Sequence, residues 1–390
     1  MSSRIVVVGG GVIGSATAYF LRASDPSASV TVIERDPTYA RSSSALSAAS
    51  IRQQFSTPLS IRMSLFGITF LRELGERLAV GGERPSIGLH EGGYLFLATP
   101  AGEATLRENH ALQLAEGAQI RLMAPDALRA RFPWLNVDDL AAGAYGERGE
   151  GWFDGYGLVQ ALRRKAQSLG ARYLAAEVVG AGARGAPHHA GRHGRRRAPS
   201  VRYRGQCGRR LGEADRGAGR HRAPGSRTAP QHLQRVVAGP ARRLPAAGRS
   251  GRRVFPSQGR TYLCGSSPSP AHDADDLPLD EVDHALFDEV IWPALAHRVP
   301  GFEALRVERS WSGYYEYNVF DHNAIIGYHP ELENCVFANG FSGHGLQQGP
   351  ATGRGVSELI LNGRYTSLDL SELDWRRVLE RRPIVEKNVV

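Results

Sequence analysis

Three glycines near the start of the chain have the spacing of a phosphate-binding turn. Gly9, Gly11 and Gly14 form the pattern G-x-G-x-x-G directly after the apolar run IVVV. Such glycines let the main chain approach a pyrophosphate, which then binds the amides and the positive dipole end of the following helix. Glu34 follows twenty residues after the last glycine, where a carboxylate can accept a hydrogen bond from a ribose 2′-hydroxyl. The cofactor-binding residues predicted in this region are Gly9, Gly11, Val12, Ile13, Gly14, Glu34 and Arg35.

Regular elements must hold this motif in place. The β-branched run at 5–8 predicts a buried parallel strand, the apolar stretch at 15–23 predicts a helix, and the VTVI run at 30–33 predicts a second strand. This order is that of a dinucleotide-binding βαβ unit. Further along, apolar periodicity predicts helices at 61–78, 101–116, 125–132, 157–169, 280–296 and 351–361, and strands at 91–98, 172–179, 310–317, 323–329 and 335–338.

The length of 390 residues favours two domains or one large composite domain. The three cysteines, Cys207, Cys264 and Cys335, lack metal-ligand spacing and are too few for a disulfide framework, as is usual in a reducing compartment. No secretory or membrane-spanning segment is visible. We therefore expect a cytoplasmic protein with no membrane span and no metal site.

The net charge of +9 is concentrated in one segment. Residues 184–253 contain 19 Arg, no Lys and two acidic residues, Glu213 and Asp215, whereas the rest of the chain has a net charge of −8. A basic protein often binds nucleic acid or an anionic surface. Because the basicity is local, we expect no nucleic-acid partner.

The composition of the basic segment is unusual in other ways. Arg, Gly, Ala and Pro make up 48 of its 70 residues, and Phe, Ile and Trp are absent, so it cannot form a packed core. Three explanations fit this composition. They are a disordered linker, an RGG-like nucleic-acid-binding segment, and a GC-rich coding sequence that is read out of frame. The sequence can be translated back into codons whose third base is left open, and the reading frame can then be advanced by one base from Gly205. The shifted frame is compatible with the sequence VVNAAGAWAKRIAELAGIELPV and, towards Phe255, with PLLVDPAGVFFRP. These stretches restore strand, turn and helix patterns, so we favour a frame shift and expect 184–253 to be disordered.

Four motifs together resemble a known family. They are VVVGGGVIG with Glu34, ASIRQQFS, FDHNAIIGYHPE and, most specifically, NGFSGHGLQQGPATGR at 339–354. The chain resembles the FAD-dependent family of D-amino-acid oxidase and sarcosine oxidase, the DAO family, over residues 4–180 and 255–365. The resemblance implies a flavin rather than a nicotinamide cofactor. It places the GFSGHG turn and the following helix at the flavin pyrimidine, where amides can stabilise the negative charge of reduced flavin.

The resemblance implies an α/β fold in which a Rossmann-like FAD-binding domain carries an inserted antiparallel-sheet (α+β) substrate domain. The FAD-binding domain would comprise 1–85, 151–183 and 310–365. The substrate domain would comprise 86–150 and 254–309. Residues 184–253 form the segment that we consider frame-shifted, and 366–390 form a C-terminal tail.

The resemblance also implies site residues. Arg52 would lie beside the flavin and bind a substrate carboxylate through two hydrogen bonds, unless it is an ordinary surface arginine. His344 would orient flavin or substrate, or only stabilise the glycine turn. Tyr315 and Glu316 lie on a strand that enters the site, between Tyr314 and Tyr317. The three tyrosines fit a hydrophobic core equally well. The predicted catalytic residues are therefore Arg52, His344, Tyr315 and Glu316, and the further cofactor-binding residues are Ser43, Ser44, Gly340, Gly343, His344, Gly345, Leu346 and Gln347.

The implied reaction is oxidation of a small secondary amine or amino acid, sarcosine-like, by hydride transfer from the α-carbon to flavin N5, followed by hydrolysis of the imine. Gln347 stands where sarcosine oxidases have a carboxylate-binding lysine, and the only lysines, Lys165 and Lys387, are not placed to activate oxygen. This favours a dehydrogenase that passes electrons to a quinone or electron-transfer protein over an oxidase that uses O2. FAD should be non-covalent, because 42–55 contains no His or Cys to tether it. The alternatives are a flavoprotein-like assembly or scaffold factor with little turnover, and an Arg-rich nucleic-acid binder.

Overall fold

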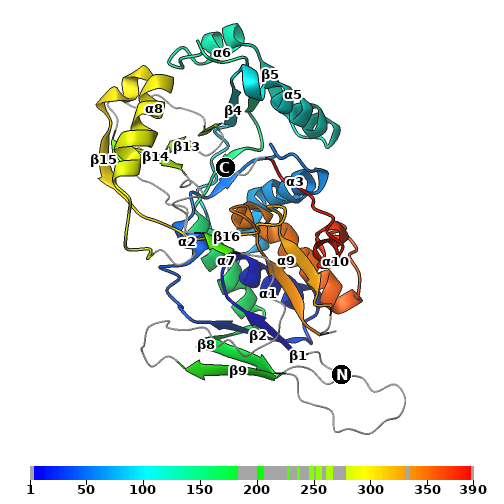
Figure 1. Ribbon diagram of the computed structural model, residues 1–390. Helices are drawn as coiled ribbons and strands as arrows, with labels where there is room; N and C mark the ends of the chain where they lie inside the picture. Colours follow the sequence, from blue (N-terminus) through cyan, green and yellow to red (C-terminus); the bar gives the residue numbers. More distant parts are fainter. Residues whose placement is uncertain are drawn as a thin grey trace.

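The computed structural model describes residues 4–182 and 278–387, apart from 331 and 333, together with six short strands between these ranges. These strands are β9 (Ser200–Gly205), β10 (Ser226–Thr228), β11 (Arg235–Val237), β12 (Ala246–Arg249), β13 (Arg252–Pro256) and β14 (Thr261–Ser266). Two larger sheets organise the described part of the chain, one in the lower half and one in the upper half of Figure 1.

The lower sheet contains β1 (Arg4–Val8), β2 (Ser29–Glu34) and β8 (Arg172–Gly182), in the order β1-β2-β8-β9. The first three strands are parallel, and β9 is antiparallel to β8. Helices α1 (Val12–Ser24), α7 (Gly155–Ser168) and α9 (Gly345–Asn362) pack together above this sheet in Figure 1. Parallel strands need crossover connections, and α1 provides the one between β1 and β2. The sheet and helices share a buried apolar core that includes Val30, Val32, Leu158 and Leu162.

The upper sheet has the order β15-β11-β14-β13-β12-β4-β6-β5. Its remaining strands are β4 (Tyr94–Ala98), β5 (Ile120–Met123), β6 (Ala142–Gly146) and β15 (Arg306–Arg309). All its pairs are antiparallel except β12 with β4. Helices α5 (Pro100–Ala115), α6 (Pro125–Arg131) and α8 (Trp292–Arg298) lie around it in Figure 1.

The remaining helices and strands belong to neither of these two sheets. Near the N-terminal half these are α2 (Ser43–Leu46), β3 (Ser50–Ile51), which pairs with β7 (Gly151–Trp152), α3 (Pro58–Arg72) and α4 (Leu74–Arg77). After α8 these are β16 (Tyr315–Tyr317), the hairpin of β17 (Ile325–Tyr328) and β18 (Val336–Asn339), and α10 (Arg376–Leu379). The chain then returns to the centre of the molecule, where its C-terminus is marked in Figure 1. This architecture confirms the predicted α/β fold with a Rossmann-like unit and a second, mainly antiparallel sheet.

Three expectations about individual elements were wrong. β1 is not a buried strand, because Val6 and Val8 are 46% and 61% exposed on a strand that lies at the sheet edge. The helix expected at 280–296 begins only after Asp283, whose carboxylate accepts a hydrogen bond from the amide of Leu286 at 3.3 Å and so provides a capping contact at the later start. The strand expected at 310–317 is restricted to β16, the part that pairs with β10.

The basic segment 184–253 also differs in part from expectation. The described part of it contains β9 to β12 and the start of β13, which pair through their main chains with β8, β16, β14, β15 and β4. The prediction of disorder was wrong at these positions, because main-chain pairing with a neighbouring strand does not require an apolar side chain. The rest of the segment lies outside the described residues, and the frame shift stays a prediction.

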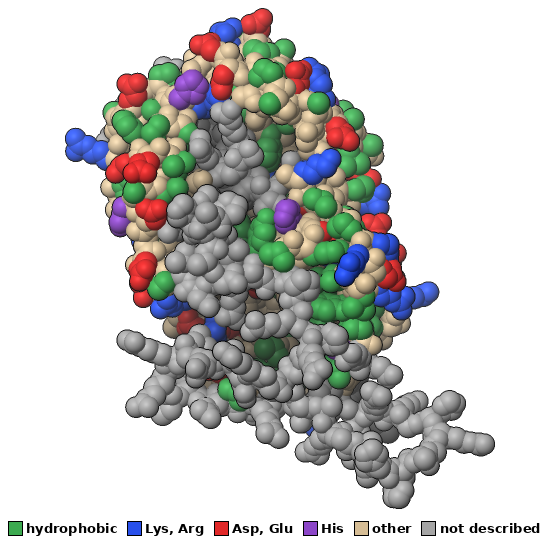
Figure 2. Space-filling view, in the orientation of Figure 1, with side chains coloured by type: hydrophobic (Ala, Val, Ile, Leu, Met, Phe, Trp, Pro, Cys, Tyr) green, Lys and Arg blue, Asp and Glu red, His purple; other side chains and the backbone are tan. Residues whose placement is uncertain are grey.

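Charged side chains are mixed over the described surface. Figure 2 shows basic and acidic groups interspersed on the face in view, without a continuous basic patch among the coloured residues. Many of them form exposed ion pairs, such as Arg62 with Glu116 and Arg164 with Glu83. Within the described ranges, no helix is long and apolar enough to cross a membrane, and no group of three His, Cys, Asp or Glu side chains is placed to bind a metal ion.

Candidate cofactor and substrate site

The glycine motif lies where β1 ends and α1 begins. Gly9 has a φ of +90°, and a Cβ at Gly14 would lie 1.9 Å from the carbonyl oxygen of Gly9, so only glycine fits this close approach. Gly11 is the N-cap of α1 and provides no capping side chain. Glu34 reaches the same turn, since its carboxylate accepts a hydrogen bond from the amide of Gly10 at 2.7 Å. The structure therefore brings the predicted phosphate turn and the predicted ribose-binding carboxylate together.

The N-termini of α1 and α9 lie at the same end of the helix layer. A Cβ at Gly349 would lie 2.8 Å from Val12 Cγ2, and a Cβ at Gly353 would lie 2.6 Å from Ala16 Cβ. Because the contact advances by four residues along both helices, α1 and α9 run in the same direction. Their positive dipole ends are therefore on the same side, an arrangement that favours an anionic ligand such as a pyrophosphate.

The turn before α9 has an unusual conformation. Ser342 has a φ of +49°, which non-glycine residues rarely adopt, and it lies between Gly340 at +75° and Gly343 at +87°. Its amide donates to the carbonyl oxygen of Glu316 at 3.0 Å, and its Oγ accepts from the amide of Asn318 at 2.9 Å. These bonds fix the turn to β16 and to the loop that follows β16.

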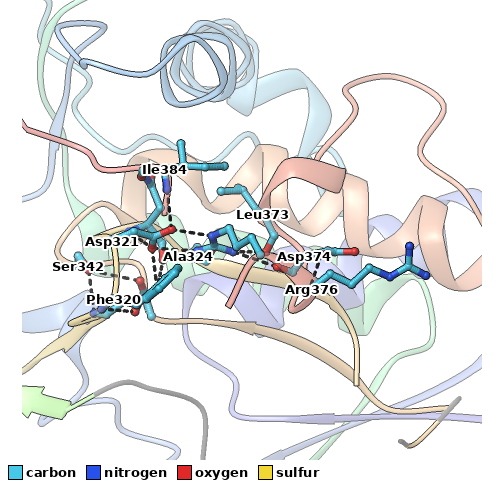
Figure 3. Close-up of polar contacts among 12 residues, drawn as sticks. Phe320, Asp321, Ala324, Ser342, Leu373, Asp374, Arg376 and Ile384 are labelled. Carbon is cyan, nitrogen blue, oxygen red and sulfur yellow. Dashed lines mark hydrogen bonds and ion pairs between the residues drawn. The ribbon is translucent and has the colours of Figure 1, made fainter. Parts of the chain in front are cut away.

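A buried ion pair is formed by Asp321, which lies beside Ser342 in Figure 3, and Arg377. Asp321 accepts hydrogen bonds from Arg377 Nε at 2.7 Å and Nη2 at 3.0 Å, and both side chains are almost completely buried. The same carboxylate accepts from Asn318 Nδ2 at 3.0 Å and from the amide of Ile384 at 3.1 Å. The pair thus links the C-terminal tail to the Ser342 turn through Asn318.

Arg52 lies in the interior at the start of the segment that leads into α3. It is 1% exposed, and its guanidinium carbon lies 4.3 Å from the ring centre of Phe55 and 5.3 Å from that of Phe96. Nη1 donates to the carbonyl oxygen of Gln54 at 2.5 Å, and the amide of Arg52 donates to Gln347 Oε1 at 3.0 Å. The surface-arginine alternative is therefore wrong, and the cation lies against aromatic faces that favour it.

His344, the N-cap of α9, is in contact with Arg52. Its Nε2 lies 3.4 Å from Arg52 Nη2, and its ring meets the ring of Phe55 edge-on at 5.0 Å between centres. A guanidinium only donates hydrogen bonds, so a hydrogen bond between these two atoms needs the tautomer of His344 in which Nε2 is the acceptor. The structure therefore brings together two of the predicted catalytic residues, although 292 positions separate them in the sequence.

The other predicted residues are not all close to this pair. Tyr315 packs its ring on the α9 turn, 2.7 Å from where a Cβ of Gly343 would lie, whereas Glu316 is exposed on the alternate side of β16. Ser44 Oγ accepts from the amide of Val12 at 3.3 Å, which places it at the phosphate turn. Ser43 and Arg35 are exposed. Gln347 contacts the main chain of Arg52.

Two orphaned polar atoms test whether these residues fit FAD. The Tyr39 hydroxyl, beside Gly10, and Gln348 Nε2, in the first turn of α9, are buried and have no hydrogen-bond partner among the described residues. Buried polar groups are normally paired, so both positions suit a ligand that offers hydrogen-bonding atoms. One lies at the adenosine end implied by Glu34 and the other at the flavin end implied by the GFSGHG turn. The site fits a dinucleotide that extends between the two helix N-termini.

Sequence reasoning missed two buried acids near Arg52. Glu150 contacts Gln53 and Gln54, and Glu386 contacts Ser56 and Thr57. Both are 0% exposed. Neither lies in a recognisable motif. Glu150 is at least 96 positions from its partners and Glu386 at least 329, so only the tertiary structure could reveal them.

Comparisons with known proteins agree with this geometry. The family described as FAD dependent oxidoreductase, DAO, matches residues 4–359. "FAD-dependent oxidoreductase domain-containing protein 1" of Xenopus laevis is 40% identical in an alignment that covers 99% of this chain and 84% of the relative. L-proline dehydrogenase from P. horikoshii has a TM-score of 0.78 at 23% identity, covering 97% of this chain and 98% of that one. Glycine oxidase from Geobacillus kaustophilus has a TM-score of 0.74 at 22% identity, with coverage of 96% and 98%.

Proposed function

Because this chain belongs to the DAO family of FAD-dependent oxidoreductases, we propose that it oxidises a small secondary amine or amino acid, for example a sarcosine-like one. The observation that carries the proposal is the buried guanidinium of Arg52 in contact with His344 at the N-terminal end of α9. A guanidinium in such a place is suited to a planar carboxylate, which it can bind through two parallel hydrogen bonds. The names of the glycine oxidase and the L-proline dehydrogenase with the same fold support an amino-acid substrate.

Each side chain has a role in this proposal. Arg52 binds the substrate carboxylate and fixes the α-carbon, His344 orients the guanidinium and the substrate, and the rings of Phe55 and Tyr315 exclude water. The N-termini of α1 and α9 stabilise the pyrophosphate and the negative charge of the reduced cofactor. When bound, FAD supplies the two-electron acceptor for the hydrogen of the α-carbon, and the imine product hydrolyses to a carbonyl compound and an amine. Glu316, which is exposed, has no role here.

We further propose that the acceptor of the electrons is a quinone or an electron-transfer protein rather than O2. Lys165 Nζ donates to the carbonyl oxygen of Ala79 on the side of α7, and Lys387 lies on the exposed tail with Glu108 at 3.8 Å. These are the only lysines of the chain, and neither contacts the α9 turn. A cytoplasmic location is part of the same proposal.

Anaerobic mixing tests the reaction. Purified, flavin-loaded protein, expressed with the reading frame restored across 205–255 if the chain as written carries no flavin, is mixed with sarcosine, glycine or L-proline, and the flavin absorbance is followed. Bleaching by one of these substrates is expected, with slow reoxidation by O2 and fast reoxidation by a soluble quinone. A flavin that stays oxidised with every amine would contradict an enzymatic role and favour a binding or assembly role.

Acid precipitation tests the mode of cofactor binding. We expect the flavin to be released into the supernatant, because no His or Cys at 42–55 can form a covalent bond to it. Yellow colour that stays in the washed protein pellet would show a covalent bond and refute this point.

A further inference from the structure

Glu150 is a completely buried acid that the proposed reaction does not use. It lies between β6 and β7, is 0% exposed, and fills a space where β6 has no side chain, since a Cβ at Gly146 would lie 2.0 Å from Glu150 Oε2. Oε1 accepts a hydrogen bond from the amide of Gln53 at 2.5 Å, and Oε2 accepts one from Gln54 Nε2 at 2.7 Å. Each carboxylate oxygen is therefore bonded to one of the two residues that directly follow Arg52.

The contacts continue from these glutamines to the Arg52 side chain. The carbonyl oxygen of Gln54 accepts from Arg52 Nη1, and Gln53 Nε2 donates to the carbonyl oxygen of Gly149 at 2.8 Å. Gln54 Nε2 also donates to the carbonyl oxygen of Tyr94 on β4 at 3.1 Å. The segment 52–54 is thus attached to the upper sheet through Glu150 and its neighbours, and this attachment sets the position of the carbonyl group that holds the guanidinium.

We infer that Glu150 is a positioning residue for Arg52: its carboxylate holds Gln53 and Gln54 so that the guanidinium of Arg52 is aligned with a substrate carboxylate. The inference rests on the proposed role of Arg52 in binding that carboxylate. Glu150 does not touch the substrate, and it acts only through the segment 52–54.

The ionised form of Glu150 fits this role better than the neutral form. Protonation of either oxygen would place an O–H donor against an N–H donor of Gln53 or Gln54. Burial raises the pKa of Glu150 to about 7, and the hydrogen bonds from Gln53 and Gln54 act in the opposite direction. The positioning contacts are therefore complete above this pKa and are lost as the pH falls through it.

The charge of ionised Glu150 also acts on Arg52, in the opposite sense. It reduces the attraction of the guanidinium for an anionic ligand. Hydrogen exchange across 52–57 separates the two effects, because it reports the hydrogen bond of the Gln53 amide and does not depend on the affinity of Arg52 for an anion.

The other described ionisable groups around Glu150 come from several elements. They are Arg52 itself, Tyr94 on β4, Tyr145 on β6, the Arg72–Glu91 ion pair beside Gly149, and His344 beyond Arg52. Burial raises the pKa of Tyr145, and the hydrogen bond from Arg72 holds the pKa of Glu91 below its usual range, so neither changes charge near neutral pH. His344 is present in native and variant proteins alike, so the difference between them isolates Glu150.

The experiment compares Glu150→Gln with Glu91→Gln as the matched control. Glu91 is also bonded to this loop, through the amide of Gly149 at 2.7 Å, but it remains ionised across the range. Both variants are made in the same flavin-loaded protein that is used to test the reaction. The dissociation constant of methoxyacetate, a redox-inert analogue of sarcosine, is measured by calorimetry at about pH 5.5 and about pH 8.5. Methoxyacetamide, which lacks the negative charge, is the matched control ligand.

We expect Glu150→Gln to weaken methoxyacetate binding about tenfold at the higher pH and less than about twofold at the lower pH, as for loss of a charge-assisted hydrogen bond. Glu91→Gln should bind methoxyacetate as the native protein does at both pH values. Binding of methoxyacetamide should show no pH-dependent difference between Glu150→Gln and the native protein. The inference would be overturned if Glu150→Gln bound methoxyacetate as tightly as the native protein, or more tightly, at the higher pH. Oxidation of amines is not required for this measurement, so failure of the proposed reaction is recognised separately.

A second measurement needs no ligand. Hydrogen exchange of peptides that cover 52–57 should be at least about tenfold faster in Glu150→Gln than in native protein at the higher pH, because the bond to the Gln53 amide is weakened. Glu91→Gln should leave it unchanged. Unchanged exchange in Glu150→Gln would overturn the positioning role even if methoxyacetate binds neither protein.

Discussion

At the scale of single residues, the proposed role of Arg52 in substrate binding rests on its surroundings. Its guanidinium is buried among aromatic rings and in contact with His344. We expect Arg52→Ala to raise the KM for carboxylate-bearing substrates about 10- to 100-fold, because a charge-assisted hydrogen bond contributes about 1.5–3 kcal/mol. Steady-state kinetics with sarcosine measures this, and flavin content serves as the internal control.

Arg62→Ala is the matched control for this substitution. Arg62 is half-exposed on α3 and pairs with Glu116 at 2.6 Å, and exposed pairs contribute about 1 kcal/mol or less. Its KM should equal that of the native protein. An unchanged KM in Arg52→Ala would remove Arg52 from the substrate site.

At the scale of elements, the packing of α1 against α9 brings two helix N-termini to the same side, where we propose that FAD binds. Gly353→Ala would place a methyl group 2.6 Å from main-chain and side-chain atoms of Ala16, so the two helices must separate. We expect a lower melting temperature and at least about tenfold weaker FAD binding. Gly102→Ala on α5 adds the same methyl group at an ordinary distance of 3.6 Å from Ala98 and should be neutral or stabilising by up to about 1 kcal/mol. Equal FAD affinity of the two variants would contradict this account of the packing.

The C-terminal tail is a second element with a defined effect. Glu386 is buried, and its carboxylate accepts hydrogen bonds from the Ser56 amide at 2.9 Å and the Thr57 hydroxyl at 3.1 Å, directly before α3. We expect Glu386→Ala to lower the free energy of unfolding by about 1–3 kcal/mol, because it leaves these donors unpaired. Urea unfolding measures this. Glu380→Ala, at an exposed position, should change little, and similar losses in both variants would refute a specific role for Glu386.

At the scale of the whole molecule, the lower sheet has no described strand beyond β1. In doubly wound sheets the first strand is flanked on both sides, yet within the described residues β1 pairs only with β2, and Val6 and Val8 are exposed. The shifted reading frame from Gly205 permits the strand VVNAA, which would suit this edge. We therefore expect a chain with the frame restored across 205–255 to be soluble and yellow, and the chain as written to be insoluble or flavin-poor.

Expression of both chains, with sequencing of the coding DNA across 180–256, tests this expectation. Hydrogen exchange at 4–8 should be slower in the restored chain, because β1 gains a second partner. A soluble, flavin-loaded chain in the present frame that resists proteases across 192–243 would refute the frame shift.

The sequence by itself determined the nucleotide turn, its βαβ unit and the family. Spacing fixes these features, because Gly9, at a φ of +90°, and Gly14, against the carbonyl oxygen of Gly9, lie where other residues do not fit, and because apolar periodicity is local to each element. It could also name Arg52 and His344, but only through motifs. The contact between them, and the burial of Arg52, depend on how α9 and the segment before α3 pack. Glu150, Glu386 and Arg377, the partner of Asp321, carry no local signal, since a buried charge is defined by partners far away in the chain. The exposed edge of β1 was likewise decided by tertiary structure, because an apolar run reads the same whether one neighbouring strand or two are present.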